Sequence, residues 1–145
     1  MNRIQFHELD IKSSLKSKRA FKKFLIELFN SERQIVERID IVFCTDEYLL
    51  MLNTKYLNHN YYTDTLSFLV SEPQKLITGE IYISIDRIIS NAASLNIPYK
   101  EELLRVIIHS CLHLCGYLDR PKLARINMKL QQEKYLKDWF VSRET

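Results

Sequence analysis

Two spacings of hydrophobic residues alternate along the chain. Short runs of β-branched residues, or runs with every second position apolar, predict strands, whereas apolar residues three and four apart predict amphipathic helices. Strands are predicted over residues 2–7, 39–44, 65–70 and 79–85. Helices are predicted over residues 14–30, 47–56, 87–95, 101–115 and 122–140. The predicted N-caps of the first three are, in order, Ser13 or Ser14, Asp46 and Asp86.

The order of these elements predicts one α+β domain over residues 1–145. A strand, a helix, a strand and a helix are followed by two strands and three helices, which suits helices packed on a small mixed β-sheet. A chain of 145 residues has the length of one ordinary domain and can bury a hydrophobic core. Residues 103–115 are apolar on nearly every side, so this helix is predicted to be central and buried.

Composition narrows the class of protein. Hydrophobic residues at 46% and charged residues at 27% are typical of a globular protein. The chain has neither a membrane-spanning stretch nor a signal-peptide core, so we expect a cytoplasmic protein with no membrane partner. Three cysteines, an odd number, suggest reduced thiols. The net charge of +3 does not by itself indicate nucleic-acid binding, and the cationic run over residues 16–23 suits either a solvated helix face or RNA contact.

A histidine pair on the predicted central helix is the clearest chemical signal. His109 and His113 are four residues apart, so both imidazoles lie on one helix face and can bind one ion. Gly116 allows the chain to turn back, which brings Asp119 toward the same ion. Two imidazoles and one carboxylate leave an open coordination position, as in catalytic zinc sites. We therefore expect one Zn²⁺ per chain, although a histidine pair alone would suit core packing and Asp119 alone would suit a turn.

The residues around the histidines restrict this chemistry. Cys111 and Cys115 each lie two positions beyond a histidine, about 200° further round the helix, so we expect them to pack in the core. Ser110 occupies the position of the general-base glutamate in the His-Glu-x-x-His motif of zinc peptidases. Peptide hydrolysis is therefore disfavoured, and the ion is expected to polarise a substrate oxygen or to activate water.

The stretch from residue 109 to 119 resembles the YbeY family of bacterial metal-dependent endoribonucleases, whose usual motif is His-Gly-x-Leu-His-Leu-x-Gly-Tyr-Asp-His. Three further motifs match the family in order and spacing, namely Leu52-Asn53-x-x-Tyr56, Thr63-Asp64-x-Leu66-Ser67-Phe68 and Gly79-Glu80-Ile81-x-Ile83-Ser84. The resemblance implies a compact α+β fold, a zinc ion held by three side chains and cleavage of single-stranded RNA. The implied role is ribosomal RNA maturation, at the 3′ end of the small-subunit rRNA, and ribosome quality control, with ribosomal subunits as partners.

The chain departs from the usual family motif at positions that affect the site. Asp119 stands where the third ligand is usually histidine, and an anionic ligand admits harder ions such as Mn²⁺ more readily. Leu57 stands where many relatives have an arginine implicated in RNA binding or cleavage. The alternative function is therefore an RNA-binding factor of ribosome assembly that has a structural metal and little or no cleavage activity.

Five other side chains are candidates for contact with RNA, namely Arg105, Arg120, Lys122, Tyr61 and Tyr62. Cations neutralise phosphates, and tyrosines stack on unpaired bases. Arg105 equally suits a helix surface, and the two tyrosines equally suit a packed loop. The nucleophile, either a metal-activated water or the 2′-hydroxyl of the RNA, stays open, as does the oligomeric state.

Overall fold

The computed structural model describes residues 3–71 and 76–143, in which four strands form one mixed sheet. Strands β1 (Ile4–Glu8), β2 (Ile35–Cys44) and β4 (Leu76–Ser84) are parallel, and β3 (Thr65–Leu69) runs antiparallel to β4. The order across the sheet is β1-β2-β4-β3. The predicted first strand includes residue 2, which lies outside the described residues.

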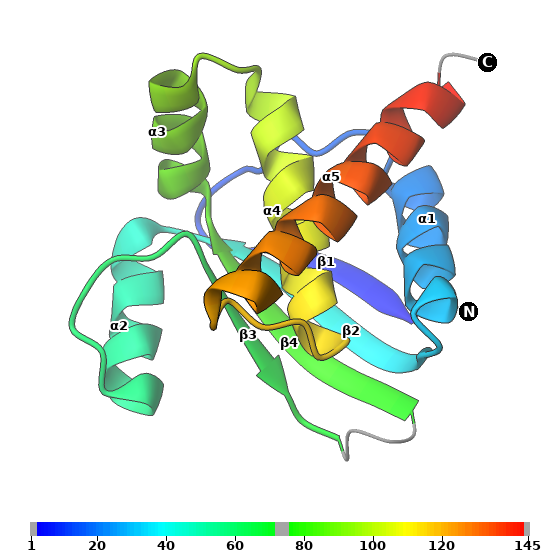
Figure 1. Cartoon of the computed structure of the whole chain (residues 1–145). Coiled ribbons are helices and arrows are strands. Elements are labelled where there is room, and N and C mark those ends of the chain that lie inside the picture. Colours follow the sequence, from blue (N-terminus) through cyan, green and yellow to red (C-terminus); the bar gives the residue numbers. More distant parts are fainter. Residues whose placement is uncertain (1–2, 72–75, 144–145) are drawn as a thin grey trace.

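Five helices occur in the described residues: α1 (Lys18–Ser31), α2 (Asp46–Leu57), α3 (Ile85–Leu95), α4 (Tyr99–Leu114) and α5 (Lys122–Arg143). Figure 1 shows α4 lying across one face of the sheet and α5, in orange and red, lying across α4. Within the described ranges, no helix is both long and apolar enough to cross a membrane. The predicted α+β fold with a small mixed sheet is confirmed.

The hydrophobic core lies between the sheet and the helices that cover it. Alternate residues of β2 and β4 point toward α4, including Ile39, Ile41, Ile81 and Ile83, and none of them exposes any surface to solvent. Most residues of α4 are buried as well, which confirms the prediction that this helix is the central one. Because α4 is fixed on so many sides, the polar side chains on its surface have defined positions.

Gly79 in β4 allows the C-terminal end of α4 to come close to the sheet. A Cβ atom at this position would lie 3.0 Å from Cδ1 of Leu114 and 3.2 Å from the carbonyl oxygen of Phe68. A side chain here would therefore force the Leu114 side chain to shift or loosen the packing of α4 on the sheet. Since Leu114 follows His113 directly, the glycine helps to set the distance between His113 and the sheet.

The N-caps of α2 and α3 differ from the predicted ones. Oγ1 of Thr45 accepts a hydrogen bond from the N–H of Tyr48, and Oγ of Ser84 accepts one from the N–H of Arg87. The aspartates predicted as caps lie instead in the first turns of these helices, where their charge suits the helix dipole. The Asp46 carboxylate accepts two hydrogen bonds from the Arg87 guanidinium, which ties the starts of α2 and α3 together.

Helix α1 begins later than predicted. The N–H and the hydroxyl of Ser13 both donate to Oε2 of Glu8, at 2.7 and 2.9 Å. These groups are therefore occupied in the loop after β1 and do not cap a helix. The helix starts at Lys18, after a sharp left-handed bend at Ser17, whose side chain makes no cap hydrogen bond.

Candidate metal centre

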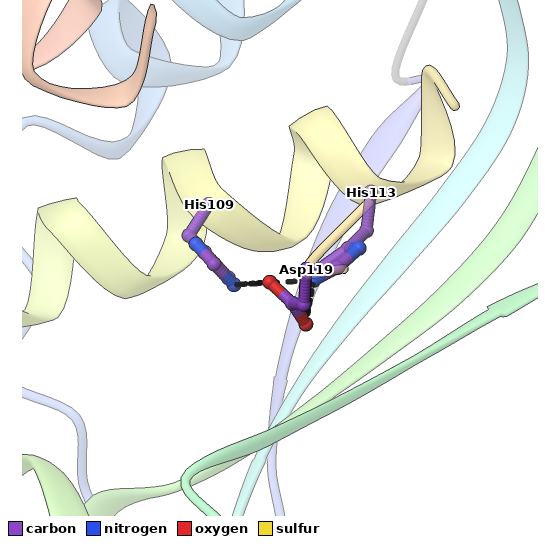
Figure 2. Close-up of side chains that lie close together, drawn as sticks. All are labelled: His109, His113 and Asp119. Atoms are coloured by element: carbon purple, nitrogen blue, oxygen red, sulfur yellow. Dashed lines mark hydrogen bonds and ion pairs between the residues drawn. The ribbon is translucent and has the colours of Figure 1, made fainter. Parts of the chain in front are cut away.

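Three side chains converge at the C-terminal end of α4. Nε2 of His113 lies 3.1 Å from Nε2 of His109 and 3.0 Å from Oδ2 of Asp119, and Nε2 of His109 lies 3.7 Å from Oδ1 of Asp119. Figure 2 shows the two imidazoles on one face of the helix with the carboxylate between them. The structure thus brings together the three residues predicted as metal ligands, all with ligand atoms within 4.8 Å of one another.

The end of α4 explains how Asp119 reaches the histidines. The N–H of Tyr117 donates to the carbonyl of Leu112, and the N–H of Gly116 donates to the carbonyl of His113. This pair of bonds is a Schellman motif, and it needs a left-handed residue, which Gly116 provides at φ +103°. The chain then turns back along the helix, and Asp119 lies beside the histidines although it is outside α4.

Hydrogen bonds at Nδ1 orient both imidazoles. Nδ1 of His113 lies 3.1 Å from the carbonyl oxygen of Tyr117, and Nδ1 of His109 lies 2.6 Å from Oε1 of Gln132. Both partners are acceptors, so each can take a hydrogen bond from a protonated Nδ1. The Gln132 amide is oriented by its own Nε2, which donates to Oε2 of Glu133 at 2.9 Å. With Nδ1 protonated in this way, each Nε2 offers its lone pair to the group of three residues.

The site passes a simple chemical test for a metal ion. Two Nε2 lone pairs and a carboxylate face one another at short range, an arrangement that repels itself unless a cation lies between the three groups. Burial lowers the pKa of His113 below its ordinary value, and the neighbouring His109 lowers it further, so the neutral form required for ligation is favoured. Two nitrogens and one oxygen are a donor set that divalent transition ions accept.

The cysteines of α4 take no part in this group. Cys111 is fully buried in the hydrophobic core, as predicted, and Cys115 packs against the edge of that core. Desolvation raises the pKa of the Cys115 thiol to about 12 and that of Cys111 well above its ordinary value. Both side chains are thus neutral thiols, which are poor metal ligands.

A cavity of about 340 Å³ opens over the three residues, between α4 and β3. Two residues of β3 that line it bond to Ser110 of α4: Oγ1 of Thr65 lies 2.8 Å from Oγ of Ser110, and Oγ of Ser67 donates to the carbonyl oxygen of Ser110. The Ser110 hydroxyl itself donates to the carbonyl of Val106. Ser110 is completely buried and hydrogen-bonded, so it cannot replace the glutamate base of a zinc peptidase.

Asp64 is a carboxylate in this cavity that the sequence analysis did not identify as a site residue. It lines the cavity together with the histidines but does not belong to the group of possible ligands. Burial raises the pKa of its carboxyl group, although the charge of His109 acts in the opposite direction. The only signal in the sequence is its place in the Thr-Asp-x-Leu-Ser-Phe motif, whose position beside α4 depends on the sheet topology.

The two tyrosines predicted to contact RNA lie in the exposed segment between α2 and β3. The ring of Tyr61 stacks on His59 with centroids 5.1 Å apart, and the Arg87 guanidinium lies 4.9 Å from the centroid of Tyr62. Tyr61 is thus packed within the segment and Tyr62 against a side chain of α3, while about half of each residue remains exposed. Both the packed and the RNA-stacking interpretations fit this arrangement.

The three cations predicted to contact RNA have different surroundings. Arg120 and Lys122 are exposed and follow Asp119 directly. Arg105 lies one turn before His109 on α4, and its side chain is only 20% exposed. Its guanidinium pairs with three carboxylates, those of Glu101, Glu102 and Glu133.

Comparisons with known proteins identify relatives of this chain. A model of the family described as "Endoribonuclease YbeY" matches residues 3–140. Proteins named "Endoribonuclease YbeY" are 40% identical in Karelsulcia muelleri, over 80% of this chain and 82% of the relative, and 36% identical in Flavobacterium psychrophilum, over 94% and 96%. The relative of the same name in Porphyromonas gingivalis is 37% identical over 94% of this chain and 89% of its own.

A solved structure shares the fold. The solution structure of TM1509 from Thermotoga maritima matches with a TM-score of 0.67 and 26% identity, covering 97% of this chain and 92% of that one. The family match spans all the described strands and helices that build the site. The chain belongs to the Endoribonuclease YbeY family.

Proposed function

We propose that the protein is a metal-dependent endoribonuclease that cleaves single-stranded RNA. The observation that carries this proposal is the convergence of His109, His113 and Asp119 at a cavity in a chain whose relatives are named endoribonucleases. The same relatives disfavour the alternative of an RNA-binding factor without cleavage activity. The family resemblance supports ribosomal RNA as the substrate, in maturation of the small-subunit 3′ end, and ribosomal subunits as partners in the cytoplasm.

The three converging residues are proposed to hold one Zn²⁺ per chain. Two imidazoles and one carboxylate leave room for substrate, which is typical of catalytic rather than structural zinc sites. Mn²⁺ is the second candidate because Asp119 supplies a hard oxygen donor. When bound, the ion supplies a Lewis acid that stabilises negative charge on a phosphate oxygen and lowers the pKa of a nucleophile.

The residues of the chain itself prepare the cavity for a phosphodiester. His109 and His113 are oriented through Nδ1 by Gln132 and by the carbonyl of Tyr117, so little rearrangement of the rings is needed before a ligand arrives. The side chain of Asp119 is 58% exposed, so the site is open to solvent next to this residue. Asp64 contributes carboxylate oxygens outside the ligand group, where they can accept a proton from the attacking hydroxyl.

The exposed cations beside the site are proposed to hold the RNA backbone. We expect the double variant Arg120→Gln/Lys122→Gln to bind single-stranded RNA more weakly, because two fewer phosphates are neutralised. The slope of log K against log salt should become shallower by about 1.4, twice the value of about 0.7 for each phosphate of a single strand. Fluorescence anisotropy with a labelled oligonucleotide at several salt concentrations measures this slope.

A matched control comes from α5, the helix that begins at Lys122. Lys134→Gln/Lys137→Gln removes two exposed cations from α5 further from Asp119. An equal loss of affinity in both double variants would mean that only net charge matters and that RNA has no defined path past Arg120 and Lys122.

The proposed activity is tested by single-turnover cleavage of an end-labelled, unstructured RNA. We expect cleavage by protein loaded with one Zn²⁺, none after treatment with a chelator, and recovery when Zn²⁺ or Mn²⁺ is added back. The same RNA annealed to its complement should be cleaved far more slowly. Binding of the RNA without metal-dependent cleavage would favour the assembly-factor alternative instead.

A further inference from the structure

We propose that Gln132, Glu133 and Arg105 form a hydrogen-bonded chain that positions His109 and strengthens it as a metal ligand. This proposal rests on the proposed function in one respect, namely that His109 is a metal ligand. All three residues lie outside the group of metal ligands. In this proposal Arg105 lies behind the site and anchors the hydrogen-bonded chain, rather than lying on the surface that binds RNA.

Gln132 is the link between α5 and the ligand. Its side chain is nearly covered by α4, with the residue 8% exposed, and its Oε1 lies 2.6 Å from Nδ1 of His109. The same amide donates through Nε2 to Oε2 of Glu133 at 2.9 Å. Both ends of the amide are used, so rotation by 180° would turn both favourable contacts into repulsive ones.

Arg105 anchors the far end of the chain. Oε2 of Glu133 accepts from both Gln132 and Nε of Arg105, the latter at 2.9 Å, and Oε1 accepts from Nη2 of Arg105 at 3.1 Å. This two-pronged contact lowers the pKa of Glu133, so its carboxylate stays charged. The remaining guanidinium contacts go to Glu101 and Glu102 on the preceding turn of α4.

The charge of Glu133 affects His109 through the amide. A carboxylate that accepts from one end of an amide polarises it, which makes the oxygen at the other end a stronger acceptor. A stronger bond at Nδ1 increases electron density at Nε2 and holds the ring in the ligating tautomer. His113 has no such support, since its Nδ1 donates to a backbone carbonyl. The two histidines should therefore respond differently to substitutions in α5.

The test compares Gln132→Leu with Gln131→Leu, a neighbouring glutamine on α5 that lies outside the chain of hydrogen bonds. Long-range proton–nitrogen NMR spectra of the metal-free proteins report the tautomer of His109. Competition with a chromophoric chelator gives the Kd for Zn²⁺ alone. We expect Gln132→Leu to populate both tautomers of His109 and to weaken zinc binding by about 10- to 100-fold, as substitutions of such supporting partners do.

Further variants test each link. Gln132→Glu keeps an acceptor for Nδ1, so the His109 tautomer should return to that of the unaltered protein. Glu133→Gln and Arg105→Gln should weaken zinc binding by less than Gln132→Leu and in the same direction. If Gln132→Leu does not fold, Gln132→Met, which preserves the length of the side chain, replaces it in both measurements.

Three results would overturn the proposal. The first is an unchanged His109 tautomer and zinc Kd in Gln132→Leu, relative to Gln131→Leu. The second is a zinc Kd unaffected by Glu133→Gln and Arg105→Gln, which would mean that only Gln132 supports His109. The third is an Arg105→Gln variant that binds RNA with a shallower salt dependence but keeps its zinc Kd, since Arg105 would then contact phosphate. None of these readouts involves RNA cleavage, so the proposed activity can fail independently.

Discussion

We expect His113→Ala to bind Zn²⁺ too weakly for detection in a purified sample. Its rate of single-stranded RNA cleavage should fall by a factor of about 1000 or more. The substitution leaves only His109 and Asp119 from the group of three, and two protein donors do not hold zinc firmly. A Lewis acid contributes several kcal/mol to stabilisation of the transition state, and each ~1.4 kcal/mol is a tenfold change in rate. Elemental analysis of protein without a histidine tag and single-turnover cleavage measure the two effects.

Cys111→Ala is the matched control on the same helix. Its thiol lies in the hydrophobic core rather than at the site, so the variant should keep one metal ion and lose only about 1 kcal/mol of stability. Loss of metal in Cys111→Ala comparable to that in His113→Ala would show that the cysteine is a ligand after all. Retention of both metal and activity in His113→Ala would exclude the proposed centre.

Trp139→Ala should have the largest effect on stability, lowering the free energy of unfolding by about 3–5 kcal/mol. The indole is 4% exposed and packs edge-on against Phe21 and Phe24, with ring centroids 5.1 and 5.3 Å away. These contacts join α5 to α1. Since whole domains are stable by only about 5–15 kcal/mol, the loss is a large share of the total. Urea denaturation followed by circular dichroism measures it.

Two further variants separate packing from other effects at Trp139. The indole Nε1 has no hydrogen-bond partner within the described residues, so Trp139→Phe should cost much less than Trp139→Ala. Val141→Ala, at a half-exposed position on the same helix, should change stability by no more than about 0.5 kcal/mol. Equal losses in Trp139→Ala and Val141→Ala would mean that α5 frays before the domain unfolds and that the aromatic contacts do not limit stability.

The sequence was sufficient to predict the part of the site that depends on local geometry. The spacing of His109 and His113 fixes their common face once the segment is helical, and Gly116 sets the turn that returns Asp119. The apolar character of the same helix predicted its central place. Each of these inferences uses residues within about one helix length, where spacing alone determines which side chains meet.

The remaining features depend on contacts between distant segments. Asp64 reaches the cavity because β3 pairs with β4 beside α4, and Gln132 reaches His109 from 23 positions further along the chain. Arg105 shares a face with His109, so its position suited phosphate contact and a helix surface equally, and only the fold brings the carboxylate of Glu133 on α5 to it. Periodicity predicts which face of a helix is buried, but it does not predict which other helix packs against that face.

Metal-dependent cleavage at the His109–His113–Asp119 group is tested most directly by a titration of one sample. Metal-free protein is loaded with increasing amounts of Zn²⁺, and bound zinc and the single-turnover rate of RNA cleavage are measured in the same tubes. We predict that the rate rises in proportion to bound zinc and levels off at one ion per chain. Full cleavage by metal-free protein, or a saturated site without cleavage, would contradict it.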